Sequence, residues 1–188
     1  PYPAATCVSI NDVVVHGIPN ESPQTIEEGD IVSIDLVIGH RGLIVDSART
    51  VGAGKISKDA QAPIDVTRNA LSAGIDAAQA GGWVRDIGAA IEKEVPKRFA
   101  IIETFCGNEV GYAVQEEPII PNFVMPGKSH QLKPGMVLAI EPMITLGGID
   151  VEILEDGYTA ITKDGSLAAH MEHTVLITED GPEILTLV

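Results

Sequence analysis

Cysteine is nearly absent from this sequence, which contains only Cys7 and Cys106. Two distant cysteines are too few for a disulfide framework and favour a reducing compartment, so we expect a cytoplasmic protein, with a single bridge left open. Long apolar runs are also lacking, and none approaches the roughly 20 residues that span a bilayer. The opening PYPAATCVSI lacks the basic and apolar regions of a signal peptide, and its start at Pro1 leads us to expect a processed or trimmed chain.

Basic residues are few, because 12 Lys and Arg against 27 Asp and Glu give a net charge of −15. This excess of negative charge argues against nucleic acid or an anionic membrane as a partner. It favours cation binding or a positively charged substrate, and the alternative is an acidic surface that only aids solubility. The 188 residues, 45% of them apolar, suffice for one folded domain with its own core.

Hydrophobic periodicity predicts a single α+β domain over residues 1–188. Two helices are expected, one capped by Ser57 and extending to about residue 79, and one over about 84–95, before Pro96. Strands are predicted at 31–38, 43–51, 100–105, 136–141, 151–154, 158–162 and 173–178.

Two aspartates in the first pair of strands form the first candidate site. The turn GHRG, Gly39 to Gly42, predicts a hairpin in which residues whose numbers sum to 81 lie opposite each other, as Asp35 and Asp46 would. Like charges so placed repel unless a cation or a shared proton lies between them. The alternative is a slipped register that leaves one acid on the surface.

Glu141 and Glu172 are two further carboxylates within apolar strand sequence, MVLAIEPMI and AAHMEHTVLI. A glycine, an apolar strand and a carboxylate six residues after the glycine occur at both 29–35 and 135–141, which points to two similar halves that face one centre. Acids on several apolar strands are hard to explain as solvent-facing residues. Converging oxygen ligands suit divalent metal ions, and bridging carboxylates suit a pair of them.

The histidines carry a weaker signal. His16 ends a valine run before a Gly-Pro turn, where its side chain can protrude into a cleft or be an ordinary turn residue. His173 points to the strand face opposite to that of the glutamate before it. The remaining histidines are interpreted as loop residues: His40, His130 and His170.

Motifs along nearly all of the chain closely resemble type I methionine aminopeptidases. They are HGIPN, GDIVSIDL, GLIVDSARTVGAG, GNEVGYAVQEEP, LKPGMVLAIEPM, DGYTAITKDGSLAA and MEHTVLITEDGPEIL. The resemblance implies the pita-bread fold, with two pseudo-symmetric halves around a site for up to two divalent ions such as Co, Mn, Fe or Zn. It also implies removal of the initiator methionine, with a peptide or nascent polypeptide N-terminus as the partner.

The resemblance assigns roles to individual residues. Asp46 and Glu172 would bridge the two ions, Asp35 would bind one ion and Glu141 the other. Glu141 would also accept the proton of the bridging water, and His16 would contact substrate near the scissile peptide. The methionine pocket would be lined by Tyr2, Cys7, Val114 and Tyr158, of which Val114 and Tyr158 stand where relatives commonly carry a larger aromatic residue and tryptophan.

Two family histidines are replaced in this chain. Asn108 stands where relatives have a metal-ligating histidine, and an amide oxygen is a poorer ligand for these metals than imidazole. Gln115 stands where relatives have a histidine that polarises the scissile carbonyl, and it can donate a hydrogen bond but cannot change its charge. Glu109, in place of a glycine, is a further candidate oxygen ligand.

These replacements leave two functions open. The first is a metalloaminopeptidase with impaired activity, and the alternative is a catalytically inactive relative that binds a peptide or protein. Relatives also carry roughly sixty residues before the point that matches Pro1, so the resemblance predicts exposed apolar surface that a homodimer or a further segment would cover.

Overall fold

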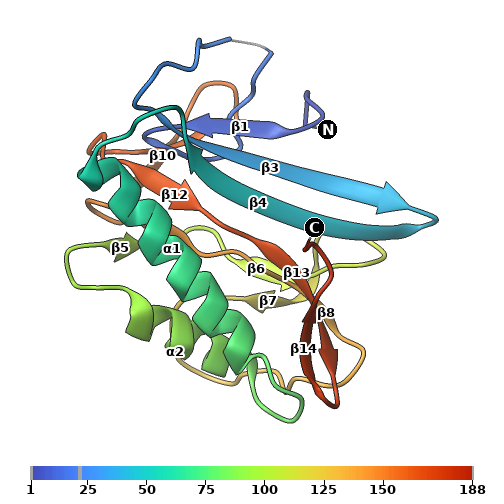
Figure 1. Ribbon diagram of the computed structural model, residues 1–188. Coiled ribbons are helices and arrows are strands. Elements are labelled where there is room, and N and C mark those ends of the chain that lie inside the picture. Colours follow the sequence, from blue (N-terminus) through green and yellow to red (C-terminus); the bar gives the residue numbers. More distant parts are fainter. Residues whose placement is uncertain (1, 21–22, 188) are drawn as a thin grey trace.

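The computed structural model describes residues 2–20 and 23–187 and contains both predicted helices (Figure 1). Helix α1 spans Lys58–Ala77 and begins after Ser57, whose side chain accepts a hydrogen bond from the Ala60 backbone N–H, as predicted. Helix α2 spans Val84–Glu94. The helices differ from the predicted ranges by no more than two residues at each end, because capping and apolar spacing are local signals.

The strands found in the structure outnumber those predicted. They are β1 (Cys7–Ile10), β2 (Val13–Val15), β3 (Ile31–His40), β4 (Leu43–Gly52), β5 (Ala100–Ile101), β6 (Gly107–Glu109), β7 (Glu116–Ile120), β8 (Val137–Ile140), β9 (Met143–Thr145), β10 (Val151–Ile153), β11 (Ala160–Thr162), β12 (Ala168–His170), β13 (His173–Thr178) and β14 (Gly181–Ile184). The prediction for 100–105 was too long, because only Ala100–Ile101 pairs with β9.

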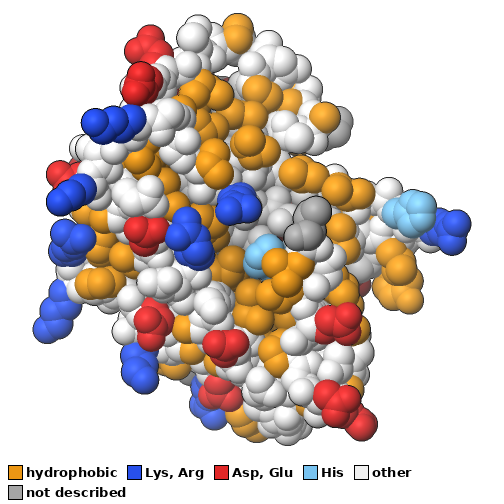
Figure 2. Space-filling view, viewed as in Figure 1, with side chains coloured by type: hydrophobic (Ala, Val, Ile, Leu, Met, Phe, Trp, Pro, Cys, Tyr) orange, Lys and Arg blue, Asp and Glu red, His pale blue; other side chains and the backbone are white. Residues whose placement is uncertain are grey.

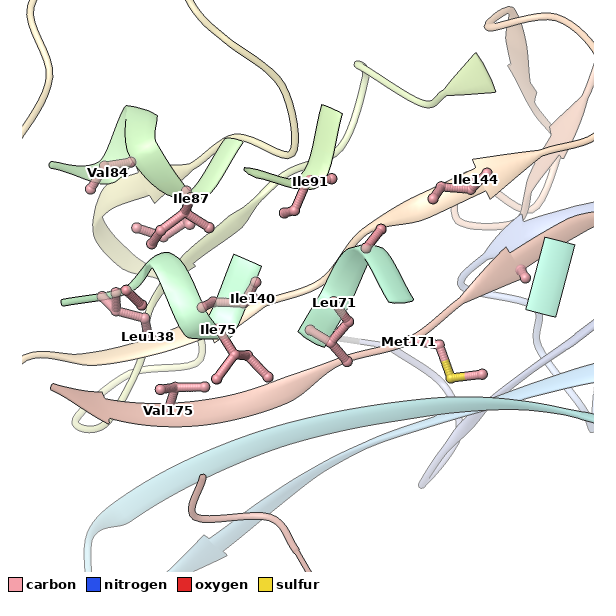
Figure 3. Close-up of a cluster of buried hydrophobic side chains, with 14 of the residues drawn as sticks. Leu71, Ile75, Val84, Ile87, Ile91, Leu138, Ile140, Ile144, Met171 and Val175 are labelled. Carbon is pink, nitrogen blue, oxygen red and sulfur yellow. The ribbon is translucent and has the colours of Figure 1, made fainter. Parts of the chain in front are cut away.

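The two helices pack against each other and against one side of the strands (Figure 1). Their buried faces meet the strands of the second half of the chain in one hydrophobic cluster, drawn in Figure 3. Ile87, Ile91 and Ile140 in this cluster are fully buried. Burial of side chains of this size stabilises the fold by roughly 1.5–3 kcal/mol each, and it fixes the position of β8 relative to the helices.

Two sets of strands share one topology. The sheet β1-β3-β4 corresponds to β6-β8-β13 within the five-stranded sheet β14-β13-β8-β6-β7. The glycines of the repeated pattern, Gly29 and Gly135, both have positive φ values, of 108° and 93°. Gly29 donates its N–H to the carbonyl of Ala53, directly after β4, and Gly135 donates to the carbonyl of Ile177, near the end of β13. The predicted similarity of the two halves therefore has a structural counterpart.

The predicted register of the β3–β4 hairpin was wrong by two residues. Asp35 pairs with Ala48, and Asp46 pairs with Val37. The turn is formed by Arg41 and Gly42, whose φ values of 51° and 82° match a two-residue turn that requires positive φ at both positions. Because the shift is an even number of residues, both aspartates still point to the same face of the sheet.

The opposite face of this hairpin exposes apolar side chains, Ile34, Ile38, Leu43 and Val51, each more than two fifths accessible. These side chains lie on the hairpin that projects from the body of the molecule (Figure 1). In Figure 2, Lys and Arg side chains gather along the edge where the helices lie, with Asp and Glu among them. Within residues 2–20 and 23–187, neither helix has the length and apolar character needed to cross a membrane.

Candidate metal centre

A cavity of about 550 Å³ lies between the two halves and is lined by the site residues that the sequence predicted, with the exception of Glu109. These residues are Tyr2, Cys7, His16, Asp35, Asp46, Asn108, Val114, Gln115, Glu141, Tyr158 and Glu172. They come from both halves of the chain, from the strands β1, β3, β4 and β6 and from loops beside other strands. The cavity also contains groups that the sequence reasoning did not select, described below.

Three carboxylates form a compact cluster in this cavity. One oxygen each from Asp35, Asp46 and Glu172 lies within 4.8 Å of the other two. Asp35 and Asp46 are diagonal neighbours on one face of the hairpin. Glu172 joins them because its backbone N–H donates to the carbonyl of Ala48 at 2.8 Å, and Ala48 pairs with Asp35 and lies two residues after Asp46.

Two threonine hydroxyls attach the hairpin to the second half of the molecule. Thr174 Oγ1 accepts from the backbone N–H of Asp46 at 2.8 Å and donates to its carbonyl at 2.7 Å. Thr50 Oγ1 makes the same pair of bonds to the backbone of His170, both at 2.8 Å. The two sets of bonds join β4 to residues 170 and 174, which lie two positions before and after Glu172. They therefore fix the position of Glu172 relative to Asp46.

Thr174→Val is expected to destabilise the protein by about 2 kcal/mol, because it leaves two backbone groups of Asp46 without partners in a largely buried place. The measurement is the free energy of unfolding from urea denaturation. Thr67→Val is the matched control, since Thr67 is equally buried but its hydroxyl donates to a helix carbonyl, that of Pro63. Loss of that bond should cost less than about 1 kcal/mol, and equal effects of the two variants would contradict the role given to Thr174.

The electrostatics of the cluster favour a cation. Burial and then the nearby Asp35 raise the pKa of Asp46 from 3.8 to about 7. Burial raises the pKa of Glu172 and of Glu141 well above the usual value, and the neighbouring carboxylates raise both further. Glu172 is 2% exposed, and its Oε1 has no hydrogen-bond partner among the described residues. A divalent ion would supply the missing partner and offset the repulsion, so the donor set fits one.

The stability of the metal-free protein should fall as the pH rises through about 7. Because the pKa of Asp46 is higher in the folded chain, its stabilising contribution is present below about pH 4 and is lost through about pH 7. In EDTA, Asp46→Asn should therefore exceed the parent in Tm at about pH 8 by more than at about pH 5. With metal the trend reverses for the parent, because protons compete with the ion. A Tm difference that does not change with pH would contradict this assignment.

Asn108 is placed to offer an oxygen to the cavity. It is 8% exposed, and its Nδ2 donates to the carbonyls of Glu109 and Val114, at 2.9 and 3.1 Å. Because only the nitrogen can donate to two carbonyls, Oδ1 is the atom left for the cavity. Gln115 has an exposed side chain at the cavity wall. Glu109 is not among the residues that line the cavity, so its suggested role as a ligand is not supported.

Aromatic residues form the wall beside the carboxylates. The rings of Tyr2 and Tyr158 meet edge to face with centroids 5.4 Å apart, and Tyr2 donates its hydroxyl to the Gly17 carbonyl. His16 has a φ of 60°, rare for a residue with a side chain, and its ring packs edge-on to Phe105. Burial lowers the pKa of His16. It is therefore neutral near pH 7 and available for hydrogen bonding in the cavity.

Cys7 lies opposite Asp35 in the sheet and also lines the cavity. Burial and then Asp35 raise the pKa of its thiol to about 12. The thiol therefore stays protonated at neutral pH and acts as a small apolar wall rather than as a thiolate ligand. Both cysteines are free in the structure.

His170 was wrongly interpreted as a loop residue. It ends β12, is 2% exposed and lines the cavity, with Nε2 3.7 Å from Oε2 of Glu141. Burial is the main cause of the lowering of its pKa to about 4. The signal in the sequence was its position two residues before Glu172, since alternate residues of an extended segment share a face. His40 also differs from the prediction, because it is the last residue of β3, whereas His130 is in a loop as predicted.

Comparison with known proteins agrees with this geometry. The model of metallopeptidase family M24 matches residues 1–179. The methionine aminopeptidase of Clostridium perfringens is 43% identical over 188 residues, which cover all of this chain and 75% of that protein. The methionine aminopeptidase of Aquifex aeolicus is 48% identical, over 98% of this chain and 72% of that protein.

Solved structures give the same result for the fold. The crystal structure of a methionine aminopeptidase from Thermotoga maritima has a TM-score of 0.93 and 42% identity, and the match covers 97% of this chain and 74% of that one. A prolidase from Pyrococcus furiosus has a TM-score of 0.76 at 23% identity, with 98% of this chain and 49% of that one covered, which shows a shared fold alone.

Proposed function

Because the chain belongs to metallopeptidase family M24, and within it to the methionine aminopeptidases, we propose that it releases N-terminal methionine from peptides and nascent polypeptides. The observation that carries this proposal is the cluster of Asp35, Asp46 and Glu172 inside a cavity with partly apolar walls. Hydrolysis of a peptide bond needs an activated water and a polarised carbonyl, and a cation at such a cluster meets both needs.

The residues divide between two ion positions. Asp35, Asp46 and Glu172 would hold one divalent ion, and Glu141 with Asn108 Oδ1 would complete a second position that shares Asp46 and Glu172. When bound, a divalent cation supplies a nucleophile from water near neutral pH and Lewis acidity toward a peptide carbonyl. The candidates are Co, Mn, Fe and Zn, which accept mixed oxygen and nitrogen ligands.

The other cavity residues position the substrate and move its proton. Glu141 would accept a proton from water and return it to the leaving amine. His16 would donate a hydrogen bond beside the scissile peptide, and Gln115 would donate to its carbonyl. Tyr2, Tyr158, Cys7 and Val114 would surround the flexible methionine side chain, which adapts to a soft apolar wall. The acidic surroundings would attract the α-ammonium group.

The test measures methionine release from a Met-Ala-Ser tripeptide after EDTA treatment and addition of Mn²⁺ or Co²⁺. We expect release with either metal, none in EDTA, and none from N-acetylated Met-Ala-Ser, which lacks the ammonium group. A folded protein that binds metal but releases no methionine at any metal concentration would contradict the proposal. It would favour the second candidate, a peptide-binding protein without turnover.

That second candidate rests on Asn108 and Gln115, which offer amides rather than imidazoles to their side of the cavity. It predicts that Met-Ala-Ser raises the Tm of the metal-loaded protein without being cleaved.

The two free cysteines support a reducing compartment, and we place the protein in the cytoplasm on that ground.

A further inference from the structure

The buried imidazole of His170 lacks any partner that would explain its position. Neither Nδ1 nor Nε2 has a hydrogen-bond partner within the part of the chain that the structure describes, although the ring is 2% exposed. A buried polar group without a partner costs about 1–3 kcal/mol, so such groups are nearly always satisfied in native proteins. His170 therefore points to a ligand that completes this part of the cavity.

The backbone of His170 is held firmly in place. Its N–H and carbonyl both bond to Thr50 Oγ1, and it pairs with Met143 in the β9–β12 ladder. Thr50 and Asp46 both belong to β4, and each is two residues from Ala48, the residue that pairs with Glu172. The ring is thus presented to the same cavity as the carboxylate cluster, from a strand that cannot slide independently of it.

The distance from His170 to Glu141 indicates what lies between them. Nε2 and Oε2 are 3.7 Å apart, which is too long for a direct hydrogen bond. Two ligand atoms on one cation, each at about 2.0–2.2 Å from it, are roughly 3–4 Å apart. The separation therefore fits two ligands of one ion better than it fits a pair bonded to each other.

We propose that His170 is a ligand of the metal centre, together with Glu141, and gives the site the nitrogen donor that Asn108 does not. The inference rests on the proposed metal centre and adds a ligand from β12 to it. A mixed set of carboxylates and one imidazole favours Mn, Fe, Co or Zn over Mg and Ca. The chain would thus retain a transition-metal site although its β6 wall offers an amide oxygen.

The test titrates Co²⁺ into the metal-free full chain and follows calorimetry and the visible absorption of the bound ion. We expect His170→Gln to weaken binding of one Co²⁺ equivalent by about 10–100-fold and to change the absorption spectrum. His173→Gln is the matched control. His173 lies three residues further on, is half-buried and bonds to Thr186 Oγ1 at 2.8 Å, so its replacement should change neither quantity.

A second measurement uses the parent chain and so does not depend on how a variant folds. Proton NMR of the Co²⁺ form should show a strongly shifted imidazole N–H that persists in His173→Gln. Unchanged affinity and spectrum in folded His170→Gln, or no shifted imidazole signal in the parent, would overturn the assignment while the carboxylate site stands. If the parent binds no Co²⁺ at all, the proposed metal centre fails together with this inference.

Discussion

Replacing Glu172 with glutamine is expected to lower the metal-supported rate of methionine release by at least about 100-fold. Glutamine keeps the volume of the side chain but replaces a negative oxygen in the cluster with a neutral amide. Its NH₂ group would point into a place lined by Asp35 and Asp46 and would repel a cation. Metal affinity, measured by calorimetry, should fall together with the rate.

The fold should survive this change. Burial and neighbouring carboxylates raise the pKa of Glu172, so its ionised form is disfavoured in the metal-free protein. The Tm of Glu172→Gln in EDTA should therefore equal or exceed that of the parent. Glu183→Gln is the control, because Glu183 lies on the exposed side of β14. Full metal-supported activity in Glu172→Gln would exclude the cluster as the catalytic centre.

Introducing an imidazole at Gln115, on the cavity wall, is expected to have the second large effect on the rate of methionine release. Gln115→His should raise kcat by about 10–100-fold. Both side chains can donate a hydrogen bond, but only imidazole can carry a positive charge and exchange a proton. Gln115 has an exposed side chain at the cavity, so a histidine fits there without disturbing the core. Gln131→His, on an exposed residue away from the cavity, is the control.

Asn108→His should act on metal affinity rather than on kcat. One ring nitrogen can donate to the Val114 carbonyl, as Nδ2 does now, which leaves the other for the cavity. If His170 is a ligand, the gain from Asn108→His should be larger in a His170→Gln background than in the parent, a coupling that a double-mutant cycle measures. If a folded variant with both Gln115→His and Asn108→His gains nothing, the deficit lies elsewhere in the cavity.

The carboxylates could be predicted from the sequence because each stands within or directly beside an apolar strand. An acid such as Asp35 or Glu141 in that setting needs a partner, and this requirement is visible without a structure. The helices were predicted for a similar reason, since Ser57 and the apolar spacing act over a few residues. Both are local signals that tertiary contacts did not override.

The remaining features depend on contacts that are distant in sequence. The hairpin register followed from a turn centred on Arg41 and Gly42 rather than on the middle of GHRG, and only Gly42 adopts a positive φ without steric cost. The place of His170 in the cavity had only a weak signal, its spacing from Glu172, because its neighbours Thr50 and Glu141 are distant in sequence. Likewise, the bridge between Ala48 and Glu172 joins residues far apart in the chain, which no local pattern encodes.

The threonine hydroxyls that join the two halves have a consequence for motion. Between β4 and the segment 170–174, side-chain oxygens make bonds that a continuous ladder would make with backbone groups. Such a seam can open by breaking a few bonds while the sheets on either side stay intact, at a free energy below that of global unfolding. The candidate ligands lie on both sides of this seam. A bound ion would therefore link the two sides, suppress the local opening and keep the width of the cavity constant.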